Sequence, residues 1–331
     1  MTAVDSGVLR SCADMGASEH SRVAGGDAVV KTLPVSNRRE LAIAGAIRMR
    51  VPADFFVRRM RDIARFKHSD LVLQVRRFSD PPALDDLAPL QIDRADLEAL
   101  ERCRVGDCEV KLPAGAIERL RTEVDSDARD ASAQRERVAK RMLLERALGY
   151  LDDGDRTLGM YLDKHRRPIS PAEDLRDIVA SLTCGGIHPD EIAYLADFPR
   201  RQTEGAESFL YWSKETFGLK PMVSLTHVII FAPRAGRRVV ASKGIYSSHY
   251  VDASVALTWL FDVDVEGEAA VDVLYVNRAR IDALGGRFGG LARTLSAGRQ
   301  RDRMGSELRA LRTRLEADWR ATRDGAVAGQ R

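Results

Sequence analysis

The stretch that decides the fold is MVSLTHVIIF at residues 222–231, followed by VDASVALTWLFDV at residues 251–263. In both, large apolar residues alternate with other residues, the period of two that is typical of a strand with one face in a core. Residues 238–246 and 271–276 repeat this pattern at hairpin spacing, so four successive antiparallel strands are predicted. The residues that share one face of the first strand are Val223, Leu225, His227, Ile229 and Phe231.

Three more strands and a helix are predicted nearer the N-terminus. Residues 27–33 and 40–51 form a hairpin, because turn residues separate two apolar runs. Pro52 begins a helix that extends to Ala64, with an acidic residue in its first turn. Residues 71–76 alternate again and end before a Pro-Pro pair, which indicates a third strand.

Between residues 85 and 204 the pattern changes to that of helices, punctuated by proline and glycine. The predicted helices span residues 94–100, 114–123, 130–150, 155–165, 171–182 and 189–198. This block is either a small helical domain or a long insertion that wraps an existing sheet.

The chain ends in a long predicted helix with an apolar stripe and a basic opposite face. The stripe consists of Phe288, Leu291, Leu295, Met304, Leu308, Leu311, Leu315 and Trp319. The arginines of the other face are interpreted as solvated, with an acidic membrane surface or partner as the alternative.

These elements predict an α+β fold, in which a curved antiparallel sheet grips the long C-terminal helix. A helical insertion, or lid, interrupts the domain of residues 26–331 at about residues 84–205. Residues 1–25 lack any apolar period and are predicted to form a flexible tail. A sheet curved around a helix leaves a cavity wherever side chains do not fill the space, and an apolar ligand can occupy it.

Composition excludes several classes of protein. The 331 residues include 52 Lys+Arg and 49 Asp+Glu, a net charge of +3, so nucleic acid is not expected as a partner. No apolar run approaches the roughly 18 residues of a membrane helix, although peripheral membrane contact stays open. The first residues lack a secretory pattern, so the cytoplasm is the default compartment, and a start further upstream would favour export.

Several segments resemble the START-like, or helix-grip (SRPBCC), superfamily. Residues 47–56 leading into residues 60–63 resemble its strand-then-helix opening, and residues 274–278 running into residues 282–286 resemble its approach to the terminal helix. Residues 103–112, 209–215 and 241–250 are similar to a group of uncharacterised bacterial START-like proteins. The resemblance spans most of residues 27–320 and implies a ligand cavity. The superfamily has no universal catalytic motif, so no catalytic residue is transferred.

Two of the four cysteines, Cys103 and Cys108, lie close enough in sequence for a turn to join them. A disulfide is sterically possible, but in a reducing cytoplasm a pair of thiols is preferred, and export would reverse that preference. Zinc would need two further ligands, and no second close Cys/His cluster is present, so neither a metal nor a cofactor is expected.

Five side chains are the candidate ligand-binding residues. His227 lies among apolar neighbours, so it is either a core histidine tied to a nearby side chain or a pocket histidine that binds a ligand. Tyr246 and His249 belong to a polar cluster at a strand junction, which is either a hydrogen-bonded turn or a site for acid–base chemistry. Trp259 and Tyr275 are candidates for the pocket wall, with core packing as the alternative.

The sequence therefore predicts a protein that binds or carries a hydrophobic or amphipathic small molecule, lipid-like or polycyclic, between the sheet and the C-terminal helix. The first alternative is a cyclase- or hydrolase-like enzyme in which His227 or His249 transfers protons. The second is a non-catalytic interaction module with a filled core. The oligomeric state is left open.

Overall fold

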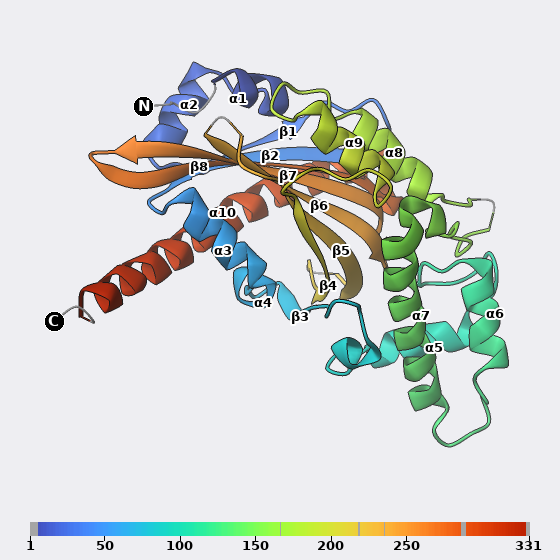
Figure 1. Cartoon of the computed structure of the whole chain (residues 1–331). Coiled ribbons are helices and arrows are strands. Elements are labelled where there is room, and N and C mark those ends of the chain that lie inside the picture. Colours follow the sequence, from blue (N-terminus) through green and yellow to red (C-terminus); the bar gives the residue numbers. More distant parts are fainter. Residues whose placement is uncertain (1–5, 166, 218, 235, 286–288, 329–331) are drawn as a thin grey trace.

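The computed structural model describes residues 6–165, 167–217, 219–234, 236–285 and 289–328. The fold is α+β, with one curved, eight-stranded antiparallel sheet and a C-terminal helix (Figure 1). The strand order is β1-β2-β8-β7-β6-β5-β4-β3. The strands are β1 (Val29–Leu33), β2 (Glu40–Met49), β3 (Val72–Arg77), β4 (Glu207–Glu215), β5 (Met222–Ile230), β6 (Arg237–Ser247), β7 (Val251–Val265) and β8 (Glu268–Ile281).

The N-terminal hairpin, the third strand and the four C-terminal strands are all present, as predicted. The sequence analysis missed β4, which pairs with β3 on one side and with β5 on the other. Both of its faces are buried, because Leu210 and Trp212 enter one core while Phe209 and Tyr211 enter the other, so its apolar residues form a continuous run without the period of two.

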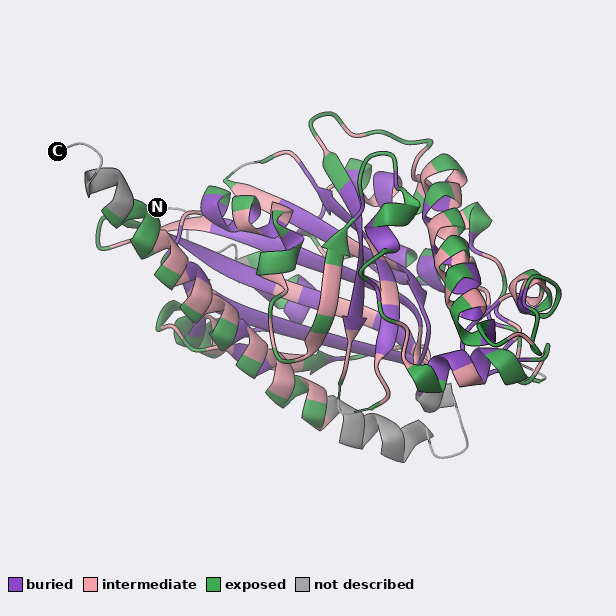
Figure 2. Ribbon diagram, turned by 90° about the horizontal axis from the view of Figure 1, so that it is seen from below, coloured by how far each residue is buried: buried purple, intermediate pink, exposed green. Residues whose placement is uncertain are grey.

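Two layers of helices cover the two faces of the sheet (Figure 1). One face packs against α3 (Ala53–Arg61), α4 (Ile63–Phe66) and α10 (Gly289–Ala328). The other packs against α1 (Ser6–Ala13), α2 (Ala17–Ala24), α7 (Ala131–Asp153), α8 (Pro171–Ala180) and α9 (Pro189–Asp197). Seen from below, in Figure 2, the strands are largely buried between these layers.

The C-terminal helix α10 contacts β1, β2 and α3. Leu308 and Leu315 of the predicted stripe are buried against the sheet, and Met304, Leu311 and Trp319 pack beside them. Gly45 of β2 permits the close approach, because a Cβ at that position would lie 2.7 Å from Leu308 Cδ1. Phe288 lies outside the described residues, and so do the side chains of Leu291 and Leu295.

The N-terminal segment is helical, so the prediction of a flexible tail is wrong for residues 6–24. Val8, Leu9 and Met15 are buried in the core on the α7–α9 face, and Cys12 forms a disulfide with Cys184 of the insertion. These short helices carry few apolar residues, and their order comes from packing and from the disulfide rather than from local propensity.

The helical block lies between β3 and β4, two neighbouring strands at one edge of the sheet. Besides α7, α8 and α9 it contains η1 (Leu84–Leu87), α5 (Arg94–Arg102), α6 (Ala114–Thr122) and η2 (Gly154–Thr157). The helix predicted over residues 155–165 is wrong: after η2 the chain is extended and Tyr161 pairs with Ile169 in an isolated bridge.

Trp212 and Lys214 of β4 anchor the insertion to the sheet. The Trp212 Nε1–H donates to the carbonyl oxygen of Asp86 at 2.9 Å, and the Lys214 ammonium donates to that of Gln91 at 2.9 Å. The helix α5 and the chain around it form an apolar core of their own, which also includes α6 and the first half of α7. The insertion therefore consists of a part that covers the sheet, α7 to α9, and a part that extends beyond it, α5 and α6 (Figure 1).

Candidate functional site

A cavity of about 380 Å³ lies where the α5–α6 part of the insertion meets the end of the sheet. We call it the insertion cavity. Its walls come from α5, α6, α7 and the loops between them, and from Val223, Tyr246 and Ser248 at the ends of β5 and β6. Most of the wall is apolar, with Leu100, Val110, Leu112, Ala139, Met142 and Leu143 among its side chains. Its volume is within the range of small-molecule sites, about 300–1,000 Å³.

Asp96 is the one acid in the wall that is buried, and Lys220 and His249 contact its carboxylate. The carboxylate Oδ1 is 2.7 Å from Lys220 Nζ and 3.0 Å from His249 Nε2. Burial alone would raise the pKa of Asp96, but the hydrogen bonds and charges of His249 and Lys220 outweigh it, so the pKa is lowered. Asp96 is therefore an ionised, fully paired carboxylate.

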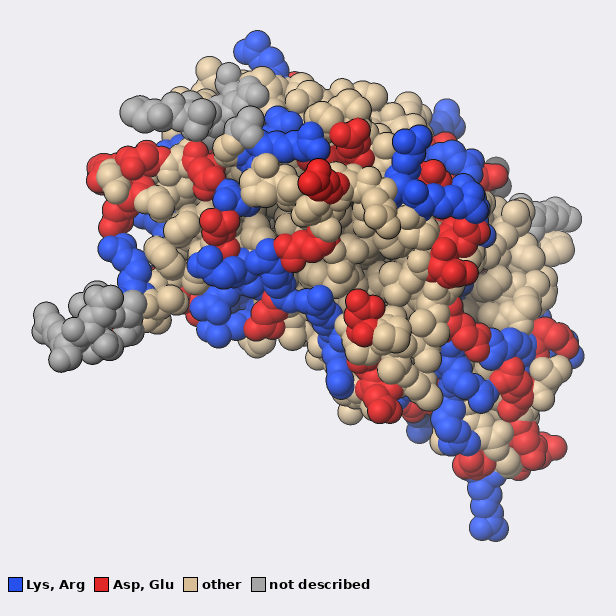
Figure 3. All heavy atoms as spheres, viewed as in Figure 1, with Lys and Arg blue, Asp and Glu red and all other residues tan. Residues whose placement is uncertain are grey.

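Arg119 and Glu145 form a second compensated set at the rim. Arg119 donates to Glu123 at 2.6 Å and to Glu145 at 3.1 Å, so each acid faces the same guanidinium. Both side chains are partly exposed to solvent. Figure 3 shows acidic and basic side chains close together at the lower right of the molecule, where α5, α6 and α7 lie.

Arg146 of α7 is the remaining charged residue in the wall, and no carboxylate lies within ion-pair distance of it among the described residues. Its guanidinium instead lies against two aromatic rings, 4.8 Å from the centre of Tyr246 and 5.7 Å from that of Tyr161. Its Nη1 is buried and makes no hydrogen bond, and the buried hydroxyl of Tyr161 is likewise without a partner. Of these two residues Arg146 lines the cavity, so its guanidinium offers hydrogen-bond donors there that no described residue uses.

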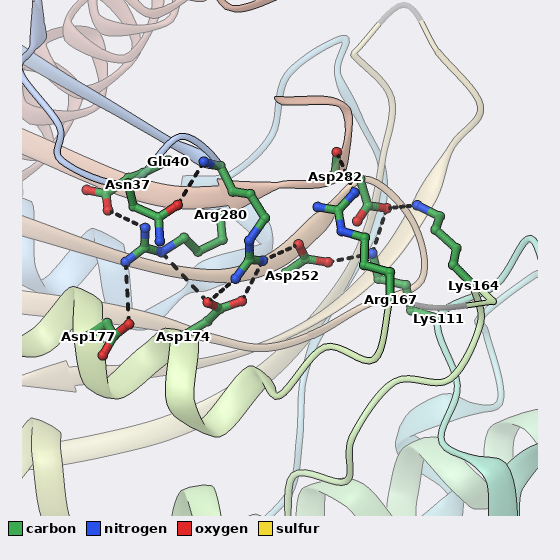
Figure 4. Close-up of polar contacts among 11 residues, drawn as sticks. Asn37, Glu40, Lys111, Lys164, Arg167, Asp174, Asp177, Asp252, Arg280 and Asp282 are labelled. Carbon is green, nitrogen blue, oxygen red and sulfur yellow. Dashed lines mark hydrogen bonds and ion pairs between the residues drawn. The ribbon is translucent and has the colours of Figure 1, made fainter. Parts of the chain in front are cut away.

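A network of buried ion pairs lies behind Tyr161 and joins the insertion to the sheet (Figure 4). Lys111, from the loop before α6, lies 2.6 Å from Asp252 of β7 and 2.7 Å from Asp282, just beyond β8. On its far side Asp252 binds Arg39 at 3.0 Å, and Arg39 also donates to Asp174 of α8 at 2.8 Å. Five separate segments of the chain are thus held together.

The two acids that share Lys111 have opposite pKa shifts. Burial, together with the charge of Asp282, raises the pKa of Asp252 to about 6 despite the attraction of Lys111. For Asp282 the effect of burial is outweighed by Lys111 and by hydrogen bonds from Asp252, Lys111 and Lys164, and its pKa falls to about 2. The charged groups of this network bind one another, so the network stabilises the cavity wall and does not line the cavity.

His227 is a core histidine, the first of the two roles considered for it. It lies on the face of β5 that α7 and α9 cover, not on the face of α10, and it is fully buried. Its Nδ1 is 2.9 Å from the hydroxyl of Tyr150, and the ring of Phe198 is centred 4.4 Å away. Burial, helped by the charge of Lys243, lowers the pKa of His227 to about 3. His227 does not line the insertion cavity.

Tyr246 is the predicted residue that lines the cavity, and His249 lies directly behind the wall. The Nδ1 of His249 is 3.1 Å from the carbonyl oxygen of Glu109, while its Nε2 faces Asp96. Both ring nitrogens therefore contact groups of the wall, and His249 joins the chain at Glu109 to α5.

Trp259 and Tyr275 project from opposite faces of the sheet, away from the insertion cavity. Trp259 is fully buried beneath the insertion, and its indole N–H donates to the carbonyl oxygen of Gly186. Tyr275 lies opposite Gly45 in the sheet, and a Cβ at Gly45 would point at Leu308 of α10. Residues paired across two strands share a face, so the Tyr275 ring lies on the face that α10 covers. The structure therefore does not bring the five candidate residues together, because alternation assigns a residue to a face without showing which layer covers that face.

All four cysteines form disulfides, Cys103 with Cys108 and Cys12 with Cys184. The preference for thiols at Cys103 and Cys108 is not what the structure shows, and the second bond was not foreseen. Cys103 and Cys108 close the loop between α5 and the cavity wall, in the apolar core of the α5–α6 part. No clustered set of His, Cys, Asp or Glu side chains suited to a metal ion occurs within the described part of the chain.

Among the helices that the structure describes, none has the length and apolar content needed to cross a membrane. Neither a protein-family model nor a curated protein sequence matches the chain. The site must therefore be interpreted from its own chemistry. Sequence reasoning missed Arg146, Asp96 and Lys220, and the only available signal was that Arg146 falls in a long predicted helix whose apolar face needed a partner.

Proposed function

We propose that the protein binds a hydrophobic or amphipathic small molecule, lipid-like or polycyclic, in the insertion cavity. The observation that carries the proposal is a mostly apolar cavity of about 380 Å³ whose wall includes one charged residue without an ion-pair partner in the described chain, Arg146. Each methylene group moved from water into such a wall gains about 0.8 kcal/mol, so an elongated apolar molecule can bind with few polar contacts. The START-like resemblance of the sequence agrees with a carrier of this kind.

This proposal moves the ligand from the place first expected. Between the sheet and α10 the large side chains Leu308, Leu315 and Trp319 occupy the space against β2 and α3. The insertion, expected to act as a lid over a cavity beneath it, instead supplies most of the cavity wall. We propose that the insertion, residues 84–205, selects the ligand, because it supplies most of the cavity wall.

The two disulfides are evidence on the cellular compartment in which the protein works. Structural disulfides persist in oxidising compartments and are rare in a reducing cytoplasm. We therefore propose that the protein works in an oxidising compartment, the export alternative of the sequence analysis. Labelling of free thiols in cells, quenched with acid, tests this: no labelled cysteine is expected, and quantitative labelling of all four would contradict it.

The first test of ligand binding is native mass spectrometry of the purified protein, followed by organic extraction. We expect a retained apolar molecule or, if purification strips it, saturable uptake of the neutral fluorescent probe N-phenyl-1-naphthylamine. Failure to retain any molecule and to take up the probe would reject the proposal and favour the interaction-module alternative.

A blocking variant locates the binding site. Gly115 lines the cavity at the start of α6, and a Cβ at that position meets no atom within 4 Å, so a side chain is accepted without strain. We expect Gly115→Trp to weaken probe binding at least tenfold. Gly298→Trp on α10 is the matched control, since Gly298 also faces open space. Equal loss of binding in both variants would contradict the location.

A further inference from the structure

We infer that Arg146 binds the head group of the ligand, and that the ligand is an amphipathic monoanion: an apolar carboxylic acid in its ionised form. The inference rests on the proposed function and specifies its ligand class. It comes from the charges of the cavity wall and from the hydrogen bonds that the wall leaves unmade.

One charged side chain of the wall has no opposite charge beside it. Asp96, Arg119 and Glu145 are each paired with opposite charges, as described above. Arg146 has no acidic partner among the described residues, so its guanidinium is the charge in the wall that a ligand can pair with. A carboxylate supplies a single negative charge, whereas a phosphate monoester brings about 1.5 to 2 at neutral pH. A single unpaired guanidinium therefore favours the carboxylate.

The geometry at Arg146 leaves its in-plane N–H groups for a ligand. The rings of Tyr246 and Tyr161, with centres 4.8 and 5.7 Å from the guanidinium carbon, stabilise the charge but accept no ordinary hydrogen bond. No nitrogen of this guanidinium makes a hydrogen bond within the described residues, and Nη1 alone is fully buried, so the other N–H groups are open to a ligand oxyanion. A donor left unpaired costs free energy that such a bond would recover. A planar guanidinium also matches a carboxylate in a two-point contact.

Tyr246 supplies a second donor at the same end of the cavity. It lines the cavity, and its hydroxyl makes no hydrogen bond to another residue within the described ranges. Burial raises the pKa of Tyr246, so the hydroxyl stays protonated at neutral pH and can donate to an anion. The opposite walls are apolar and accept the hydrocarbon part of the acid.

The test compares decanoate, decanol and decyl phosphate, which share one chain and differ in the head group, by displacement of N-phenyl-1-naphthylamine at pH 7.5. We expect the wild type to bind decanoate about ten- to a hundredfold more tightly than decanol, the range of a charge-assisted hydrogen bond. Arg146→Met should remove this difference, while Arg146→Lys should keep part of it, because a lysine retains the charge without the fork.

Arg141→Met is the matched control, because Arg141 lies on the same helix but pairs with Glu123 at the surface. It should bind decanoate like the wild type. Equal binding of decanoate and decanol by the wild type would overturn the monoanion inference and leave the proposed function standing. Tighter binding of decyl phosphate than of decanoate would overturn the assignment to a carboxylate. Displacement of the bound probe by none of the three would overturn the inference and leave the proposed function standing. Failure of the probe itself to bind, with no molecule retained on purification, would reject the proposed function. If Arg146→Met does not fold, the wild-type comparison still decides.

Discussion

Replacing His227 should change how the stability of the protein depends on pH. His227 is fully buried under α7 and α9, and its pKa is lowered to about 3 from an ordinary value of about 6.5. The unfolded chain therefore binds the His227 proton at a higher pH than the folded protein does. The corresponding stability is complete above pH 6.5 and is lost as the pH falls towards the folded-state pKa.

The magnitude follows from the width of that window. Well below pH 6.5 each pH unit costs about 1.4 kcal/mol in the free energy of unfolding, and the slope is half of that at pH 6.5, so His227 alone accounts for about 2.3 kcal/mol between pH 6.5 and 4.5. We expect His227→Asn, which never becomes charged, to remove this contribution to the slope. The smaller side chain lowers stability by an amount that does not depend on pH, because it leaves an unfilled volume.

Urea unfolding of the wild type and His227→Asn at several pH values, followed by tryptophan fluorescence, gives the slope of the unfolding free energy against pH for each protein. The carboxylates are the same in both proteins, so their contributions cancel in the difference between the two slopes. Tyr150→Phe is the matched control: it removes the 2.9 Å hydrogen bond to Nδ1 but keeps the ring and the burial. Since burial is the main cause of the shift, Tyr150→Phe should lose about 1 kcal/mol at every pH and retain the wild-type slope. Identical slopes for the wild type and His227→Asn would refute the reasoning.

Three further perturbations test how the insertion is held. Gly154 ends α7 with φ of 64°, and a Cβ there would lie 1.9 Å from a backbone oxygen, so Gly154→Ala should cost about 3 kcal/mol or more in thermal unfolding. Gly267→Ala, with φ of 82° but open space around it, should cost less, about 1 kcal/mol. Cys12→Ser opens a loop of sequence separation 172 and should lower stability by about 2–4 kcal/mol, more than Cys103→Ser, whose loop has a separation of 5; equal losses in urea unfolding would contradict this order. Lys111→Met removes the cation that two acids share and leaves Asp252 with Arg39 and Asp282 with Lys164, so it should cost about 3 kcal/mol, the lower end for a broken buried pair; a loss below 1 kcal/mol, again measured in urea, would show that the network does not hold the wall.

The sequence predicted strands well because a strand with a buried face shows its period directly. Residues 222–231 and 251–263 alternate without a break, and both occupy the expected strands. The strand β4 escaped because it follows a long helical block, and its aromatic residues enter two different cores. The periodicity of a short stretch of sequence shows that one face of a strand is buried, but it does not show which core covers that face.

The candidate site was predicted less well, for the same reason. His227 and Trp259 lie on apolar faces as the pattern requires, but the insertion covers those faces and fills the space between. Arg146 carried no local signal, because an arginine in a charged helix is ordinary until its partners are known. That Arg146 has no acidic partner among the described residues depends on the packing of α7 against the ends of β5 and β6, which no local stretch of sequence shows.

The position of the cavity follows from the way the two cores meet. The core beneath α7–α9 includes Leu143 and Val223, and the separate core of the α5–α6 part includes Leu100 and Val110. All four residues line the cavity, so it lies along the joint between two units that are each packed within themselves. Interiors pack densely within a unit, and a joint between two units is where unfilled volume remains. The buried ion pairs of Lys111 cross this joint and fix its width, so the same contacts that stabilise the insertion set the space available to a ligand.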